Sequence, residues 1–193
     1  MGKDMHYTGH KRVVVVTPVY KEEMSREEEA SILFAQKHLQ DYNKVIISPE
    51  KLRKKNAFCK FWQEKGYTVV FFKDKYFDGI AGYNALMLSV DFYKQFIDYE
   101  YILISQLDAL ILSNSLDEWL DKDLDYIGPP WISEGKKLKV ESAGNGGFSL
   151  RRVKAFMEVL ESKKFVVPQN TFVSLPARAG VLNLLVLRLM ILT

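Results

Sequence analysis

Cysteine is almost absent from this sequence, and histidine is scarce. Cys59 is the single cysteine, so the chain can form neither an internal disulfide framework nor a cysteine-rich metal site. Charge of one sign is also lacking: the net charge is +3, and lysine and arginine are spread along the chain except at residues 51–56 (KLRKKN). Because a nucleic-acid-binding surface needs a concentrated basic face, this composition argues against a nucleic-acid partner.

Apolar runs suited to export or to membrane insertion are missing too. Residues 1–12 (MGKDMHYTGHKR) are polar and lack the apolar core of a secretory signal, which predicts a cytoplasmic protein. Residues 180–192 (GVLNLLVLRLMIL) are strongly apolar, but this stretch is too short to span a bilayer and contains Arg188. The stretch leaves open a peripheral association with the inner face of the membrane.

What the sequence does contain is the pattern of a globular α/β domain. The chain has 193 residues, of which 48% are hydrophobic and 26% charged, as expected for one soluble domain. Strand-like runs alternate with helix-like segments, and this order predicts a three-layer α/β fold whose mixed, mostly parallel sheet is flanked by helices. The expected strands are 12–20, 43–48, 67–72 and 101–105, and the expected helices are 25–39, 56–65 and 82–98.

Two helix starts have local signals. Ser25 precedes Glu28 by three residues and opens an acidic first turn, which is the pattern of a capping box for the helix 25–39. Residues 148–162 (FSLRRVKAFMEVLES) also show helical spacing, and Ser149 is the candidate cap of that helix.

One carboxylate follows the fourth expected strand. Asp108 lies in ISQLDALIL (104–112), just past the carboxyl end of the strand 101–105, where α/β sheets bind their ligands. A carboxylate at that edge can bind a metal ion or a ribose hydroxyl. It can equally cap a turn, and position alone does not separate the two roles.

A glycine cluster is the second informative stretch. Gly144, Gly146 and Gly147 lie in ESAGNGGFSLRR (141–152), where glycine lets the backbone approach a ligand closely. The pattern matches neither the phosphate-binding loop nor the dinucleotide fingerprint. A tight turn without a ligand explains the cluster as well as a phosphate cradle does.

Four motifs together resemble a known family. They are VVVVTPVYK (13–21), ISQLDALIL (104–112), LDYIGPPW (124–131) and GNGGFSLR (144–151). In order and spacing they resemble a bacterial glycosyltransferase-like family with the glycosyltransferase-A fold, long catalogued as a domain of unknown function. The resemblance implies transfer of a sugar from a nucleotide-sugar donor to a glycan, lipid-linked glycan or similar acceptor in bacterial surface polysaccharide synthesis.

The resemblance also implies where the substrates bind. The donor-binding candidates are Thr17, Pro18, Val19, Tyr20, Gln106 and Asp108. Trp131, Gly146 and Gly147 are the acceptor-side candidates, since an aromatic face packs well against a sugar ring. A buried core position explains Trp131 equally well.

Metal use and catalysis are less complete in this sequence than in the family pattern. Asp108 falls on the second acid of the metal-binding Asp-x-Asp motif and is the candidate ligand for Mn²⁺ or Mg²⁺. Arg151 or Arg152 can supply positive charge to the diphosphate instead, or can simply be solvated. Gln106 stands where the first acid is usual, and no general base is identified. A noncatalytic nucleotide-sugar-binding or glycan-binding protein, or an inactive remnant of the same fold, is therefore the alternative.

The end of the chain departs from the rest in composition. Residues 165–193 contain no Asp, Glu or His, so they offer neither a general base nor a strong metal ligand. We interpret residues 1–164 as the glycosyltransferase-A-like domain and 165–193 as an atypical apolar tail. The tail is either a genuine amphipathic or membrane-touching segment or the product of a truncation or frameshift.

Overall fold

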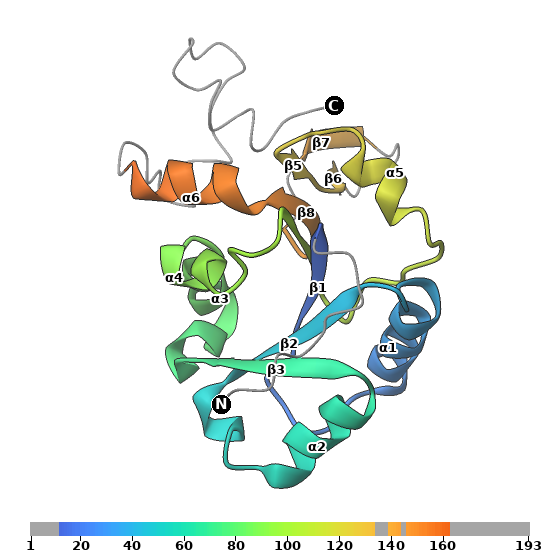
Figure 1. Cartoon of the computed structure of the whole chain (residues 1–193), viewed down its shortest axis with the longest axis vertical. Helices are drawn as coiled ribbons and strands as arrows, with labels where there is room; N and C mark the ends of the chain where they lie inside the picture. The colour runs from blue at the N-terminus through green and yellow to red at the C-terminus, as the bar shows by residue number, and fades with distance from the viewer. Residues whose placement is uncertain (1–11, 134–138, 144–145, 163–193) are drawn as a thin grey trace.

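The computed structural model describes residues 12–133, 139–143 and 146–162, with side chains at 12–130 and 146–162. In this part of the chain, six strands form a sheet in the order β3-β2-β1-β4-β8-β5, and β6 and β7 pair separately (Figure 1). The strands are β1 (Val13–Pro18), β2 (Asn43–Pro49), β3 (Tyr67–Phe72), β4 (Tyr101–Ser105), β5 (Tyr126–Ile127), β6 (Pro130–Ser133), β7 (Lys139–Ala143) and β8 (Phe148–Arg152).

The first four strands are parallel and form the centre of the fold. β1 pairs with β2 and β4, and β2 pairs with β3. The chain builds β2 and β3 on one side of β1 and then crosses to place β4 on the other side. Strand order therefore reverses between β1 and β4. The predicted fold class, an α/β fold with a mixed, mostly parallel sheet, is confirmed.

Helices cover both faces of this sheet (Figure 1). They are α1 (Arg26–His38), α2 (Asn56–Glu64), α3 (Gly79–Met87), α4 (Val90–Lys94), α5 (Leu116–Leu120) and α6 (Val153–Glu161), with 3₁₀ turns η1 (Glu50–Leu52) and η2 (Asp74–Phe77). Helices α1, α2 and α5 lie on one face, and α3, α4 and α6 lie on the other. Among the described helices, none has the length and apolarity that crossing a bilayer requires.

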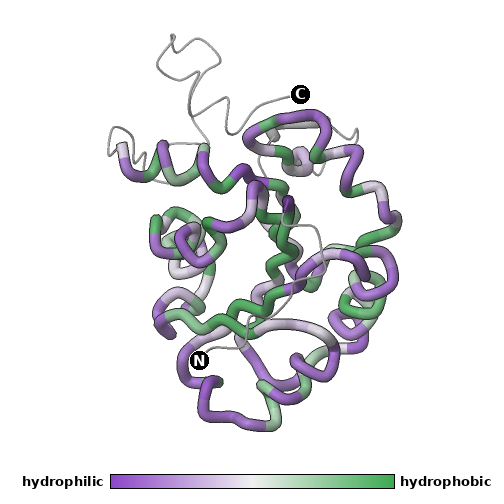
Figure 2. The backbone as a smooth tube through the Cα atoms, viewed as in Figure 1, coloured by the Kyte–Doolittle hydropathy of each residue, from purple (hydrophilic) through white to green (hydrophobic). Residues whose placement is uncertain are grey.

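β1 explains why the sheet needs cover on both faces. Val13 and Val15 pack in a cluster with Leu39, which follows α1, whereas Val14 and Val16 pack in the opposite cluster with Phe92 of α4. Successive side chains of a strand point to opposite faces, so a continuous run of valines makes both faces apolar. Figure 2 shows the result, with hydrophobic residues along the central strands and hydrophilic residues around the periphery.

The predicted capping box of α1 is confirmed. The Ser25 side chain accepts a hydrogen bond from the Glu28 amide at 3.3 Å, and the Glu28 carboxylate accepts one from the Ser25 amide at 2.8 Å. The expected strands at 43–48, 67–72 and 101–105 and the helix at 56–65 also match β2, β3, β4 and α2 within a residue at most of their ends.

The predicted long helix at 82–98 is wrong, because the structure contains two shorter helices there. α3 ends at Met87, and Ser89 then caps α4 by accepting a hydrogen bond from the Phe92 amide at 3.2 Å. Both helices keep apolar residues at helical spacing, so the pattern continues across a break that the Ser89 cap creates.

The helical pattern expected over 148–162, with Ser149 as its cap, is also corrected. Residues 148–152 form β8, which runs antiparallel to both β4 and β5, and α6 begins only at Val153. Ser149 is 1% exposed within the sheet and is not a cap. The hydrogen bonds that hold β8 come from strands distant in sequence, so the local helical pattern gives no sign of them.

Candidate functional site

A cavity of about 550 Å³ opens at the carboxyl ends of β1 and β4, where the strand order reverses. Its walls come from the segment after β1, the segment after β4, the glycine turn before β8, and residues 77–84 of η2 and α3. Sheets of this type bind ligands in the crevice at such a reversal.

The end of β1 contributes two of its four predicted donor residues to the cavity. Pro18 lines the cavity, and so does Tyr20, which is 56% exposed at its rim. Thr17 and Val19 are buried, and neither belongs to the lining. The Val19 amide donates to the Ile47 carbonyl at 2.9 Å, which holds the chain in position as it leaves the sheet.

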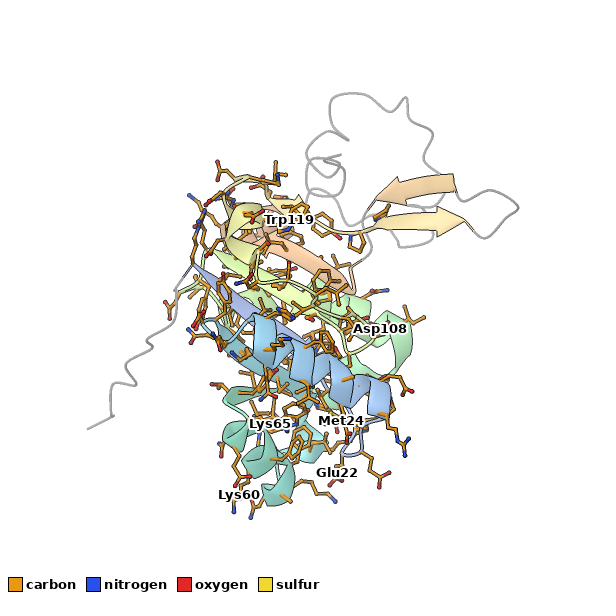
Figure 3. All side chains as sticks on the ribbon, turned by 90° about the vertical axis from the view of Figure 1, so that its right-hand side faces the viewer. Glu22, Met24, Lys60, Lys65, Asp108 and Trp119 are labelled. Atoms are coloured by element: carbon orange, nitrogen blue, oxygen red, sulfur yellow. The ribbon has the colours of Figure 1, made fainter. Side chains whose placement is uncertain are left out.

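The end of β4 is joined directly to the glycine turn. The Gln106 amide donates to the Gly147 carbonyl at 2.9 Å, and Gln106, Asp108, Gly146 and Gly147 all line the cavity. Asp108 is exposed, and Figure 3 shows it at the edge of the sheet beside the green helical ribbon. Residues predicted separately for the donor and acceptor sides thus share one cavity.

Trp131 is the remaining predicted site residue. Its backbone lies in β6, paired with Ser142 of β7. The side chain of Trp131 lies outside the described ones, so the expected contact of its ring with an acceptor sugar stays a prediction.

The sequence interpretation missed the wall formed by η2 and α3. Phe77, Ile80, Tyr83 and Asn84 all line the cavity. The sequence feature that could have indicated this wall is Gly82. A β carbon added there would collide with the Lys75 carbonyl oxygen. Close packing of α3 on η2 therefore requires glycine there.

Glu28 brings a second carboxylate to the cavity, but that group is already engaged. It lies 2.8 Å from the Lys21 ammonium and accepts the Ser25 amide of the capping box. Burial acts to raise the pKa of Glu28, but the Lys21 and Ser25 hydrogen bonds outweigh it and hold the pKa below its ordinary value. Glu28 is therefore a firmly ionised structural group rather than a free base.

The described residues supply no ready-made metal centre. No group of three His, Cys, Asp or Glu side chains lies close enough to hold an ion in the part of the chain that the structure describes. Asp108 is the cavity carboxylate not engaged in an ion pair within that part. A cation held there would need oxygen ligands from water and from a bound substrate, which is how Mg²⁺ is commonly held.

A larger cavity, of about 800 Å³, lies at the opposite edge of the sheet, near the amino ends of β2 and β3. Three of its polar side chains already have protein partners. Gln36 donates to the Lys65 carbonyl, Asn43 donates to the Tyr99 hydroxyl, and the Lys44 ammonium donates to three backbone carbonyls. None of the predicted site residues lines it.

The fold and the smaller cavity define the molecule as a doubly wound α/β protein with a cavity at the carboxyl edge of its sheet, where such folds commonly bind ligands. Residues 66–177 match the model of a family described as a protein of unknown function, DUF5672. This match covers more than half of the chain, and the chain belongs to that family. No curated protein matches the sequence.

Similar solved structures include a nucleotidyltransferase and two glycosyltransferases. A cytidylyltransferase from Leptospira borgpetersenii is 13% identical, with a TM-score of 0.47 over 81% of this chain and 66% of that one. The apo form of glycosyltransferase GlyE from Streptococcus pneumoniae is 15% identical, with a TM-score of 0.46 over 78% and 37%. The mannosyltransferase PcManGT from Pyrobaculum calidifontis, in complex with GDP-Man and Mn²⁺, is 15% identical, with a TM-score of 0.44 over 77% and 46%. The chain spans less than half the length of either glycosyltransferase.

Proposed function

We propose that the cavity binds a nucleotide-sugar donor and that the protein transfers the sugar to a glycan or similar acceptor, in bacterial surface polysaccharide synthesis. One observation carries the proposal. Pro18, Tyr20, Gln106, Asp108 and the glycine turn at 146–147, which the family resemblance singles out, line one cavity at the reversal of strand order.

The chemistry of transfer fits the groups in this cavity. A nucleotide-sugar donor leaves a diphosphate, and its developing charge must be offset by a metal ion or by cationic groups. Asp108 would hold Mn²⁺ or Mg²⁺ together with water and donor phosphate oxygens. The ion would supply positive charge at the leaving group.

A specific observation favours the alternative, a noncatalytic protein that binds a nucleotide sugar or a glycan. Among the described lining residues, only Glu28 and Asp108 carry carboxylates, and Glu28 is engaged with Lys21 and Ser25. Asp108 alone would have to serve as both metal ligand and proton acceptor. An inverting transfer needs a base for the acceptor hydroxyl, so binding without turnover is the outcome this arrangement allows.

Asp108→Asn tests whether the carboxylate acts through a metal. We expect this change to weaken binding of nucleoside diphosphates, measured calorimetrically, by about tenfold or more in Mn²⁺, since even groups that only orient a metal ligand contribute that much. The loss in EDTA should be smaller. Asp78→Asn is the matched control. Asp78 directly precedes α3, is exposed, makes no side-chain capping bond and does not line the cavity.

Three outcomes would contradict parts of this proposal. Equal losses with Mn²⁺ and EDTA would exclude a metal-linked role for Asp108. A second experiment separates an enzyme from a binding protein. It measures the release of free sugar from a panel of UDP, CDP and GDP sugars. Binding of a nucleotide sugar with no release would favour the noncatalytic alternative, and no binding of any nucleotide would refute the proposed function.

A further inference from the structure

Two neighbouring side chains of α3 present unused hydrogen-bonding groups at the cavity. Tyr83 and Asn84 both line it, and the Tyr83 hydroxyl and the Asn84 amide nitrogen are buried. The Asn84 amide nitrogen has no hydrogen-bond partner among the described residues, and the Tyr83 hydroxyl makes none of ordinary geometry there, although the Gln106 side chain interacts with it. Buried polar groups are nearly always paired, because an unpaired one opposes folding. Both groups can donate hydrogen bonds, so an acceptor-rich ligand would satisfy them.

Behind the neighbouring wall, formed by the glycine turn, lies a buried cation with neutral partners only. Arg151 is 5% exposed. Its guanidinium donates to the Ser149 hydroxyl at 3.0 Å, to the Tyr93 hydroxyl at 3.0 Å and to the Gly146 carbonyl at 3.2 Å. No carboxylate of the described residues forms an ion pair with it. A buried charge is normally paired with an opposite charge, and here that partner is missing from the described part of the chain.

The Arg151 charge lies close to the cavity surface. A β carbon added to Gly146, which lines the cavity, would lie 3.0 Å from Nη2 of Arg151. The guanidinium therefore lies against the glycine turn that lines the cavity. At this depth a positive charge attracts an anion more strongly than it would in water.

The protonation of Tyr83 fits a donor rather than a base. Burial raises the pKa of the Tyr83 hydroxyl, and the Arg151 charge and Gln106 lower it by less, so the net shift is upward. The phenol therefore stays protonated at neutral pH. It can donate to an anion but cannot supply the missing proton acceptor.

We propose that Tyr83, Asn84 and Arg151 form an anion site on the inner wall of the cavity, which holds the diphosphate of the ligand without requiring a metal ion. Tyr83 and Asn84 donate hydrogen bonds to phosphate oxygens. Arg151 is a positioning residue that fixes the Gly146 turn and supplies positive charge through it. The inference rests on the proposed function for the identity of the ligand as a nucleoside diphosphate. Asp108, exposed at the rim, remains free for a ribose hydroxyl or a divalent cation.

The test uses the full chain, inorganic pyrophosphate as the probe, and calorimetry in EDTA. We expect wild type to bind pyrophosphate and Tyr83→Phe to bind it at least about tenfold more weakly, as loss of a hydrogen bond to a charged group predicts. Tyr67→Phe is the matched control, since the Tyr67 hydroxyl is also buried and unpaired but lies outside the cavity lining. Both variants should melt at a higher temperature than wild type without ligand, because each loses an unpaired buried hydroxyl.

Arg151 needs a separate readout, because removing a buried arginine can prevent folding. Arg151→Lys keeps the charge and should retain measurable pyrophosphate binding with weaker affinity, whereas a folded Arg151→Gln chain should lose it. If Arg151→Gln fails to fold, the Tyr83→Phe result decides.

Failure of the anion site and failure of the proposed function look different. No pyrophosphate binding by wild type, or equal affinities in wild type and Tyr83→Phe, overturns the anion site. Equal weakening by Tyr83→Phe and Tyr67→Phe also overturns it. Tyr83-dependent pyrophosphate binding without binding of any nucleoside diphosphate leaves the anion site intact and refutes the proposed function.

Discussion

Hydrogen-bond donors and a carboxylate occupy different parts of the cavity. Tyr83 and Asn84 lie on α3, with Arg151 behind the neighbouring wall, whereas Asp108 is exposed at the rim. An anion next to an unpaired carboxylate is unfavourable, so in the proposed arrangement the inner donors would hold the phosphates, and a cation at Asp108 would reach phosphate oxygens from the rim.

Gly82 is the residue on which the position of the α3 wall depends. Gly82→Ala should lower the free energy of unfolding by about 2 kcal/mol, the usual cost of forcing extra atoms into a packed contact, because the new methyl group meets the Lys75 carbonyl. It should also weaken pyrophosphate binding, since Tyr83 and Asn84 follow directly. Urea denaturation and calorimetry measure the two effects.

Gly66→Ala provides the comparison. Gly66 has a positive φ of 81° and no atom near an added β carbon, so the change should cost about 1 kcal/mol through backbone strain alone. It should leave pyrophosphate binding unchanged, because Gly66 lies between α2 and β3, away from the α3 wall. Unchanged binding in Gly82→Ala would show that α3 does not position the ligand.

At the scale of elements, the start of α1 combines a structural and a site role. The capping box satisfies amide groups that the first turn of a helix leaves unpaired, and its Glu28 also lines the cavity. The Lys21 ion pair with Glu28 then ties the segment after β1 to the helix. The loop that carries Tyr20 is held at both ends.

Ser25→Ala tests the contribution of this cap. We expect it to lower the free energy of unfolding by about 1 kcal/mol, because the Glu28 amide loses its partner. Ser115→Ala is the matched control, since Ser115 precedes α5 but makes no side-chain capping bond. Chemical denaturation of both variants measures the difference, and similar losses in the two would mean that the Ser25 bond contributes nothing specific.

At the scale of the whole molecule, the cavity depends on the crossing from β3 to β4. That crossing places β4 beside β1, and β8 then returns antiparallel to β4 and brings the glycine turn to Gln106. Residues separated by more than a hundred positions in sequence, such as Tyr20 and Gly146, therefore line one space. A parallel sheet buried on both faces keeps this geometry stiff.

The interpretation of residues 165–193 as an atypical tail leads to a prediction for the whole chain. Residues 165–193 lie outside the described ones, and the described cavity walls come from residues 18–147. Deleting residues 173–193 should therefore leave pyrophosphate binding and any hydrolysis of nucleotide sugars unchanged. It should also raise solubility, since an apolar segment is removed. A deletion that abolishes turnover present in the full chain would make the tail part of an enzyme.

The sequence by itself determined the features that depend on near neighbours. The valines of β1, the cap at Ser25 and the glycine that ends α2 at Gly66 act within a few residues, so periodicity and capping rules identify them. The position of Asp108 after β4 follows in the same way from one strand and its end. The family resemblance added Gln106 and the glycine turn.

The tertiary structure alone decided which of these residues meet, and it revealed partners with no local signal. Residues 148–152 have a helical pattern, yet β4 and β5 recruit them into the sheet, because backbone hydrogen bonds from both sides outweigh local preference. That pairing turns Arg151 inward beneath Gly146, while packing of η2 places Tyr83 and Asn84 at the same cavity. The burial of Arg151 without a carboxylate partner among the described residues arises only on folding, because every arginine of an unfolded chain is exposed to water.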